Sequence, residues 1–320
     1  MDRPNLVLET KGLHHWFGSK HVLHNVEIQI VRGQIVSLVG PSGCGKSTLL
    51  RALLGTHPPC SGRVILYDRH DRPHHILSPG RDRGIVYQRY ALFPFLTAQE
   101  NVAIGPKLDE TTIHGRFFGY LRWRKLRQAH MAEAAEILEK LGLKDSLRKY
   151  PHELSGGMQQ RVAIGQALIM KPSILLLDEP FGALDEATRE DLQLLLLGLY
   201  EENLKALSEN AIPPHTILIV THELNEAIYV GDRVIGLSQY WDWKGAGHQR
   251  PPGATIVYDK PAPIYSPGEQ KEYETFISQR QGIRGVVFEP ELPFSPDENC
   301  NFWEEVDAGR VGGVLVKRDV

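Results

Sequence analysis

The stretch GPSGCGKST, residues 40–48, decides the fold of this chain. It comes directly after the apolar run GQIVSLV and opens STLLRALLG, which has helical spacing. This is the structural context of the phosphate-binding pattern G-x-x-x-x-G-K-[ST]. Glycines in such a loop let backbone N–H groups point inward at a phosphate, and the following helix N-terminus adds about half a positive charge. The stretch therefore predicts a nucleotide site.

Individual residues of this loop have separate expected roles. Lys46 is expected to reach the β- and γ-phosphate oxygens, and the Ser47 hydroxyl to ligate Mg²⁺. Cys44 fills a variable position, for which we expect no redox role. The loop residues predicted to bind the nucleotide are Gly40, Pro41, Ser42, Gly43, Cys44, Gly45, Lys46, Ser47 and Thr48.

A pair of acids ends the continuous apolar run SILLLDE, residues 173–179, which is typical of a buried parallel strand. Asp178 is expected at the same sheet edge as the phosphate loop, where it would hold Mg²⁺ through water. Glu179 is placed to polarise the attacking water, so that phosphoryl transfer becomes hydrolysis. The alternative is a solvated acid pair, and the presence of a phosphate loop favours the catalytic interpretation.

Two further polar residues end predicted strands. His222 follows HTILIVT and would emerge at the same edge, where it can hydrogen-bond the γ-phosphate or the attacking water. A lone histidine is more often structural, but the repeated edge position favours a functional one. Gln88 ends GIVYQ and can join Mg²⁺ or water when its loop is drawn in. The predicted catalytic residues are Glu179, His222, Gln88 and Lys46, and the predicted metal-site residues are Ser47, Gln88 and Asp178.

Strands alternate with helical stretches along most of the chain, which predicts an α/β fold around a mainly parallel central sheet. Short alternating runs near the start predict an antiparallel β subdomain. The pattern turns helical over about 95–170, which predicts an inserted α-helical subdomain. We expect a nucleotide-binding domain over 5–262. Residues 263–320 carry scattered prolines and weak periodicity, which predicts a small C-terminal extension of unknown role.

Composition excludes several classes of function. The net charge of the 320 residues is −3, so no global basic surface indicates nucleic acid as a partner. The three cysteines form no C-x-x-C pair, which argues against a disulfide framework or a structural zinc site. The N-terminus lacks the apolar core of a signal peptide, and no run approaches the roughly 18 apolar residues of a membrane span. Any membrane role is expected to be peripheral.

The motifs occur in the order GPSGCGKST, YQRYALFPFLTAQEN, LSGGMQQR, ILLLDEP, FGALD and VTHE. This ordered set resembles the nucleotide-binding subunits of ATP-binding-cassette (ABC) transporters over roughly residues 5–237. The resemblance implies a P-loop ABC cassette fold, ATP and Mg²⁺ as ligands, and ATP hydrolysis. The stretches FGALDEATRE and VTHELNEAIYVGDRV are similar to those of the nitrate/sulfonate/taurine importer group.

LSGGMQQR, residues 154–161, contains no acid, histidine or thiol, although its serine and glycines suit a phosphate. In the family it resembles, two cassettes pair head to tail and this stretch caps the ATP held by the other subunit. The sequence has LSGGM where the commonest form is LSGGQ, and Gln159 follows at once. The residues that the resemblance implies contact the partner's nucleotide are Ser155, Gly156, Gly157 and Gln159, with Asp185 from FGALD.

Adenine binding is assigned through the same resemblance, because in the family an aromatic residue before a glycine stacks on the base. The stretch HHWFGSK puts Phe17 at that position, before Gly18. Trp16 is the alternative stacking residue, or a core residue. Base stacking on such a ring contributes about 1 kcal/mol and reads shape more than identity.

Partners are also implied by the resemblance. The segment ALFPFLTAQENVAIG resembles the groove that receives a helix from an integral membrane permease, with ordinary subdomain packing as the alternative. The expected protein is the ATPase subunit of an importer, dimeric and most simply a homodimer, at the cytoplasmic face of the inner membrane, and served indirectly by an extracytoplasmic solute-binding protein. The alternative function is a soluble ABC ATPase acting on nucleic acid or ribosomes. Residues 115–127, rich in cations and aromatics, are either a lipid- or permease-facing patch or a solvated surface.

Overall fold

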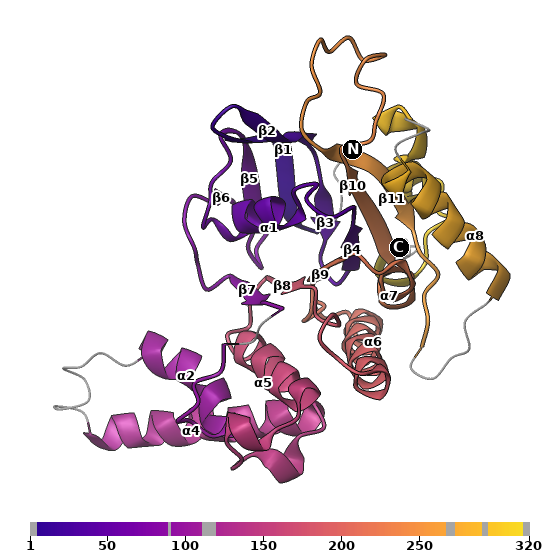
Figure 1. Cartoon of the computed structure of the whole chain (residues 1–320). Coiled ribbons are helices and arrows are strands. Elements are labelled where there is room, and N and C mark those ends of the chain that lie inside the picture. Colours follow the sequence, from indigo (N-terminus) through magenta and orange to yellow (C-terminus); the bar gives the residue numbers. More distant parts are fainter. Residues whose placement is uncertain (1–4, 89–90, 111–119, 267–272, 290–293, 316–320) are drawn as a thin grey trace.

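The computed structural model describes residues 5–88, 91–110, 120–266, 273–289 and 294–315. Its centre is a six-stranded sheet in the order β11-β10-β4-β9-β8-β7 (Figure 1). Neighbouring strands pair in parallel except β10 and β11, which confirms the mainly parallel sheet. The strands span Ile35–Val39 (β4), Arg83–Val86 (β7), Ile174–Asp178 (β8), Ile217–Thr221 (β9), Arg233–Ser238 (β10) and Thr255–Pro261 (β11).

Both faces of this sheet are buried, as its continuous apolar strands predict. Successive side chains of a strand point to opposite faces. On β4, Ile35 and Val39 therefore join one core with α6 (Glu186–Ser208) and α7 (Leu224–Val230), and Val36 and Leu38 join another with α1 (Lys46–Leu54).

A second sheet packs over the α1 face and is antiparallel throughout, which confirms the predicted N-terminal subdomain. Its main path runs β2-β1-β5-β6, and β3 pairs with β1. The strands span Leu6–Phe17 (β1), Lys20–Val26 (β2), Gln29–Val31 (β3), Ser61–Tyr67 (β5) and Pro73–His75 (β6).

The helical insertion lies on the side of the central sheet away from this antiparallel sheet (Figure 1). It contains α2 (Ala98–Glu110), α4 (Tyr120–Lys140) and α5 (Gly156–Leu168), with 3₁₀ turns at Lys144–Ser146 and Pro151–Glu153. A separate apolar cluster, which includes Val102, Leu138 and Val162, holds these helices together. Of the basic and aromatic segment 115–127, residues 115–119 lie outside the described residues, and the rest begins α4.

The C-terminal residues fold back on the central sheet beside β10 and β11 (Figure 1). They form α8 (Tyr273–Ile283), a π-helical turn at Arg284–Phe288, a 3₁₀ turn at Pro296–Asn299, α9 (Phe302–Asp307) and a 3₁₀ turn at Gly313–Leu315. Val287 is fully buried in the same core as Val234 of β10. The Ser238 hydroxyl donates a 2.7 Å hydrogen bond to the Val287 carbonyl oxygen. The division of the chain at residue 262 stays a prediction.

A buried arginine joins this tail to the sheet. The guanidinium of Arg233 is fully buried and donates two 2.6 Å hydrogen bonds to the Asp259 carboxylate. It also lies 3.7 Å from the centre of the Phe302 ring. A buried charge is tolerated only when it is paired in this way, and the planar guanidinium suits both contacts. Phe302 therefore closes the site that keeps Arg233 out of water.

Among the described residues, every helix is too short or too polar to cross a lipid bilayer.

Candidate nucleotide-binding and catalytic site

The phosphate loop lies between β4 and α1, as its sequence predicts. Gly43 and Gly45 have φ angles of 78° and 111°, in the left-handed region that favours glycine. A Cβ atom on Gly40 would lie 2.2 Å from the Leu237 carbonyl oxygen, so the loop can approach β10 only without a side chain. Lys46 is 7% exposed, and its Nζ donates hydrogen bonds to the carbonyls of Gly40 (2.7 Å) and Pro41 (3.0 Å).

The ammonium group of Lys46 thus lies inside the turn of the phosphate loop, close to where the phosphates of a nucleotide would bind. Cys44 contributes instead to the core beneath the loop, and burial raises the pKa of its thiol. Ser47 is the second residue of α1, directly after Lys46, which puts its hydroxyl at the helix N-terminus.

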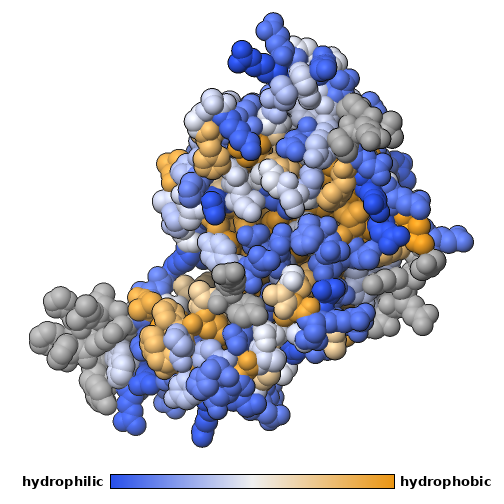
Figure 2. All heavy atoms as spheres, in the orientation of Figure 1, coloured by the Kyte–Doolittle hydropathy of each residue, from blue (hydrophilic) through white to orange (hydrophobic). Residues whose placement is uncertain are grey.

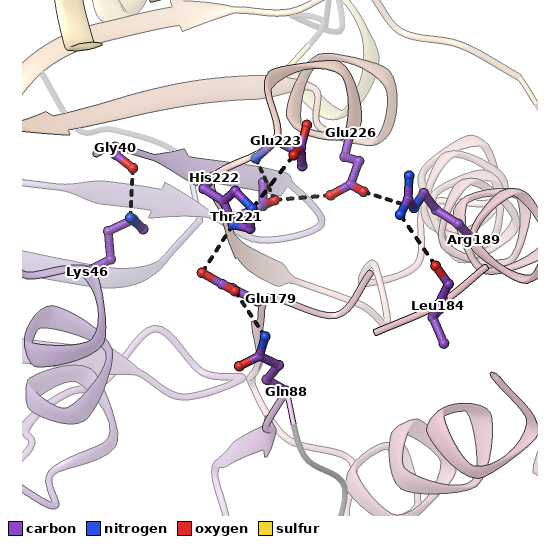
Figure 3. Close-up of polar contacts among 10 residues, drawn as sticks. All are labelled: Gly40, Lys46, Gln88, Glu179, Leu184, Arg189, Thr221, His222, Glu223 and Glu226. Carbon is purple, nitrogen blue, oxygen red and sulfur yellow. Dashed lines mark hydrogen bonds and ion pairs between the residues drawn. The ribbon is translucent and has the colours of Figure 1, made fainter. Parts of the chain in front are cut away.

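Three of the four predicted catalytic side chains meet at the carboxyl end of neighbouring strands (Figure 3). The Gln88 amide follows β7 and donates a 3.2 Å hydrogen bond to Oε2 of Glu179, which follows β8. Nδ1 of His222, which follows β9, lies 3.3 Å from Oε1 of the same carboxylate. Strand order makes this possible, because β7, β8, β9 and β4 are consecutive neighbours and the phosphate loop follows β4.

Glu179 adopts a backbone conformation that sequence reasoning did not anticipate. Its φ is 48°, in the left-handed region, which costs a non-glycine residue on the order of 1 kcal/mol. Its N–H still donates a 2.8 Å bond to the Val220 carbonyl. The turn redirects the side chain as β8 ends, and the carboxylate lies between the Gln88 amide and the His222 ring. Strain of this kind is often retained at functional sites.

Asp178 is the last residue of β8 and is half-buried. Burial raises the pKa of its carboxyl group, and the neighbouring charge of Glu179 raises it further, whereas Arg51 and Lys46 lower it. A desolvated carboxylate beside a second carboxylate favours a bound cation. The oxygens of Ser47, Asp178 and Gln88 are of the kind that Mg²⁺ prefers, so these residues fit the predicted metal site.

A second network links the catalytic edge to the FGALD loop, and the sequence analysis missed it. The Thr221 hydroxyl donates to Oε2 of Glu226 (3.1 Å), and Arg189 Nε lies 3.4 Å from Oε1 of the same carboxylate. Arg189 also donates to the Leu184 carbonyl (3.4 Å). Figure 3 shows this chain of contacts running from β9 through α7 to the start of α6. Burial raises the pKa of Glu226.

The LSGGMQQR stretch forms the N-terminus of α5. Ser155 is the N-cap, and its side chain accepts a 3.3 Å hydrogen bond from the Met158 N–H. Gly157 is pressed against α6, because a Cβ there would lie 1.8 Å from Thr188 Cγ2. Thr188 in turn donates both its N–H and its hydroxyl to Asp185, the N-cap of α6. These hydrogen bonds lower the pKa of Asp185. The LSGG stretch and the FGALD loop, both predicted to face the partner chain, therefore contact each other within one chain.

The Gln159 amide faces its own chain. Its Nε2 donates hydrogen bonds to the carbonyls of Pro151 (2.9 Å) and Leu154 (3.1 Å). These bonds brace the turn that leads into Ser155. A contact between Gln159 and a partner's nucleotide would require the amide to leave both carbonyls, so we propose that it shapes the loop.

The two candidate adenine-stacking residues both lie at the end of β1. Phe17 is 48% exposed, and the edge of its ring meets the His15 ring at 4.8 Å. Trp16 is less exposed and stacks on His21 at 4.3 Å between ring centroids. The Phe17 ring is therefore more accessible than the Trp16 ring, and its role in base stacking stays a proposal.

The chain combines a phosphate loop, an acid pair at a strand end, and a helical insertion in which LSGG forms the N-terminus of α5. Together these features define a cassette ATPase. The chain belongs to the ABC transporter family, whose family model matches residues 23–182. It is an ABC ATPase subunit of the importer type.

Two curated relatives show the importer group. The aliphatic sulfonates import ATP-binding protein SsuB of Bacillus subtilis is 38% identical over 213 residues, which are 67% of this chain and 71% of that protein. The taurine import ATP-binding protein TauB of Escherichia coli O157:H7 is 36% identical over 298 residues, which are 90% of this chain and 100% of that protein. These relatives confirm the predicted nitrate/sulfonate/taurine group and do not favour action on nucleic acid or ribosomes.

Among solved structures, the ATP-binding cassette MJ0796 bound to ADP and Pi is similar to this chain. The sequences are 29% identical, the TM-score is 0.56, and the match covers 81% of this chain and 100% of that one. That protein is a dimer in a post-hydrolysis state. The match confirms the cassette fold.

Proposed function

We propose that two copies of this chain hydrolyse ATP at two shared sites and thereby drive a membrane permease that imports a small sulfonate-, taurine- or nitrate-like solute. The observation that carries the proposal is the convergence of Gln88 and His222 on the Glu179 carboxylate, beside the phosphate loop. Such a carboxylate is placed to accept a proton from an attacking water.

The proposed chemistry follows from these contacts. Lys46 exchanges its bonds to the Gly40 and Pro41 carbonyls for phosphate oxygens when ATP binds. Glu179 orients the attacking water and accepts its proton, and His222 fixes the carboxylate and bonds the γ-phosphate. Mg²⁺, held by Ser47, Asp178 and Gln88, would supply charge neutralisation of the phosphates. Gln88 contacts Glu179 and precedes the loop that leads into the helical subdomain, so it can report the presence of the γ-phosphate to that subdomain.

The second half of each site is proposed to come from the partner chain. Ser155, Gly156 and Gly157 start α5, so their N–H groups and the helix dipole are suited to bind an anion. The γ-phosphate of the ATP bound by the partner is the proposed anion. Dimer closure would then depend on ATP, because the phosphate is the shared ligand.

Substituting Ser155 by Arg is expected to abolish ATP-dependent dimerisation and leave nucleotide binding by the single chain unchanged. The larger side chain would fill the space in front of α5. Analytical ultracentrifugation with and without ATP measures the first effect, and a fluorescent nucleotide measures the second. Ser208→Arg, at the end of α6, is the matched control. Normal dimerisation of Ser155→Arg would contradict the role of this loop.

The proposed permease contact is the loop that follows Gln88. Phe95 is 69% exposed and Phe93 39% exposed, although both are apolar, and their rings lie 5.8 Å apart. Figure 2 shows apolar residues at the surface of this helical part of the molecule. Exposed aromatic residues in a patch favour a protein contact.

Hydrogen bonds from α2 fix this loop in place. Asn101 is fully buried, and its amide donates to the carbonyls of Phe93, Leu96 and Thr97. Gln166 of α5 donates to the Asn101 carbonyl at 3.1 Å. The exposed aromatics and the helix that begins with Ser155 therefore share a rigid connection. It provides a physical route by which dimer closure can move a docked permease.

Replacing Phe95 by Asp is expected to abolish co-purification of an integral membrane subunit and to leave the ATPase rate of the isolated chain within about twofold. The charge would sit where an apolar contact is proposed. Co-purification from cells that express the full chain, with mass spectrometry, provides the measurement. Leu77→Asp, at another exposed apolar residue, is the control. Equal recovery of the membrane subunit by both variants would place the permease elsewhere.

We propose the cytoplasmic face of the inner membrane as the location, since ATP is available there, and an extracytoplasmic solute-binding protein as an indirect partner. Two identical chains suffice for the dimer, because each carries both a phosphate loop and an LSGG stretch. These assignments rest on the importer relatives.

A further inference from the structure

Three histidines gather on one face of the β1–β2 hairpin because its register is irregular. Leu13 pairs with Val26, His15 with Leu23 and Trp16 with His21, so β2 gains one extra residue at each of two steps. Each extra residue is a β-bulge. In a regular strand His21 and His24 would point to opposite faces, but the bulge between them turns both to the same face. That face also carries His14 of β1.

The ring nitrogens of these residues lie at the spacing of a metal centre. One nitrogen from each of His14, His21 and His24 lies within 4.8 Å of the other two. Nδ1 of His14 and Nε2 of His21 are 3.3 Å apart. Tetrahedral zinc with Zn–N bonds of about 2.0–2.1 Å separates its ligand nitrogens by about 3.3–3.4 Å. The closest pair therefore already has the required separation.

The surroundings also suit neutral imidazoles that lack a strong partner. Nδ1 of His24 is buried and has no hydrogen-bond partner among the described residues. Burial lowers the pKa of His14 and His21, and it lowers that of His24, with help from the charges of neighbouring histidines, to about 4. A neutral imidazole is the form that ligates a metal. Trp241 stacks on His24 at 5.5 Å.

A fourth histidine comes from the loop between β10 and β11. The ring of His248 meets the edge of the His24 ring, with centroids 4.9 Å apart. The same loop is tied to the hairpin by a 2.8 Å bond from the His24 N–H to the Ala254 carbonyl. His248 is thus an additional candidate ligand, on a segment already fixed to the cluster, whereas the nitrogens that lie within 4.8 Å of one another belong to the other three histidines.

We propose that His14, His21 and His24 form a binding site for a divalent transition-metal ion of the zinc class, with His248 as a fourth ligand. Imidazole nitrogen selects such ions over Mg²⁺, which prefers oxygen. Binding would replace the hydrogen bond that His14 Nδ1 accepts from the Asn25 N–H. The ion would cross-link β1 to β2 directly beside Trp16, which stacks on both His21 and His14.

The test measures Zn²⁺ binding by the full chain, freed of metal with a chelator, in competition with a chromophoric zinc chelator. We expect one tight site per chain in the wild type. His21→Gln and His24→Gln should each weaken it at least tenfold, since loss of a mere supporting residue around a metal costs about 10–100-fold. His70→Gln, which removes an exposed histidine elsewhere, should bind as the wild type does. Equal affinity in all variants would overturn the proposal.

A second measurement does not depend on the folding of any variant. Crystals of the wild-type chain grown with Zn²⁺ and measured at the zinc absorption edge should show an anomalous peak among the three rings. A peak only at other histidines, or none, overturns the assignment.

Discussion

Replacing Glu179 by Gln is expected to leave ATP binding intact, reduce ATP turnover by about 10²–10⁴-fold and accumulate an ATP-bound dimer. The amide preserves the size of the side chain, which lies between Gln88 and His222. The amide cannot accept the proton of the attacking water. The closed, ATP-bound dimer therefore forms but does not hydrolyse its ATP. Phosphate release measures turnover, and size-exclusion chromatography with ATP measures the dimer.

The matched control is Glu201→Gln, an exposed position on α6, which should turn over ATP at the wild-type rate. If Glu179→Gln retained wild-type turnover, the carboxylate would not be the base. If turnover fell and no dimer accumulated, hydrolysis would not be the step that opens the dimer.

Replacing Lys46 by Ala is expected to impair phosphate binding itself as well as turnover. Removal of an electrostatic contact of this kind typically costs about 2.7–4 kcal/mol of transition-state stabilisation. Lys46 is also the group that closes the loop on the Gly40 and Pro41 carbonyls, so the loop loses its central cation. Affinity for a fluorescent ATP analogue and ATP turnover should both fall by about two orders of magnitude or more.

Lys205→Ala removes an exposed ammonium group from α6 and should change neither quantity. Thermal unfolding of both variants separates a loss of binding from a loss of folding. Wild-type affinity in a folded Lys46→Ala chain would contradict the phosphate-binding role.

Local patterns in the sequence predicted the parts of this protein whose structure is decided locally. The strands that precede Gln88, Glu179 and His222 follow from apolar runs and the residues that end them. The convergence of those three side chains could also be expected, because parallel strands bring their carboxyl ends to one edge. The phosphate loop needs only its own glycines and the helix that follows.

Features that depend on distant residues were not predictable in the same way. The positive φ of Glu179 is imposed by the strands around it, and a glutamate at this position does not predict it. The link from Thr221 through Glu226 to Arg189 joins β9 and the adjacent α7 to the start of α6, which is distant from them in the sequence. The packing of the tail depends on Phe302 covering Arg233, and no helical periodicity reveals such a contact. The bulges that gather the histidines arise from strand register, which the sequence alone leaves open.

The central claim is that each ATP is completed by the phosphate loop of one chain and the LSGG stretch of the other, and mixing two inactive variants tests it most directly. Ser155→Arg chains and Lys46→Ala chains, each inactive alone, are combined in equal amounts. In a mixed dimer both lesions fall in one site, and the other site is intact. The account predicts ATP turnover well above the sum of the two separate preparations. Turnover equal to that sum would contradict it.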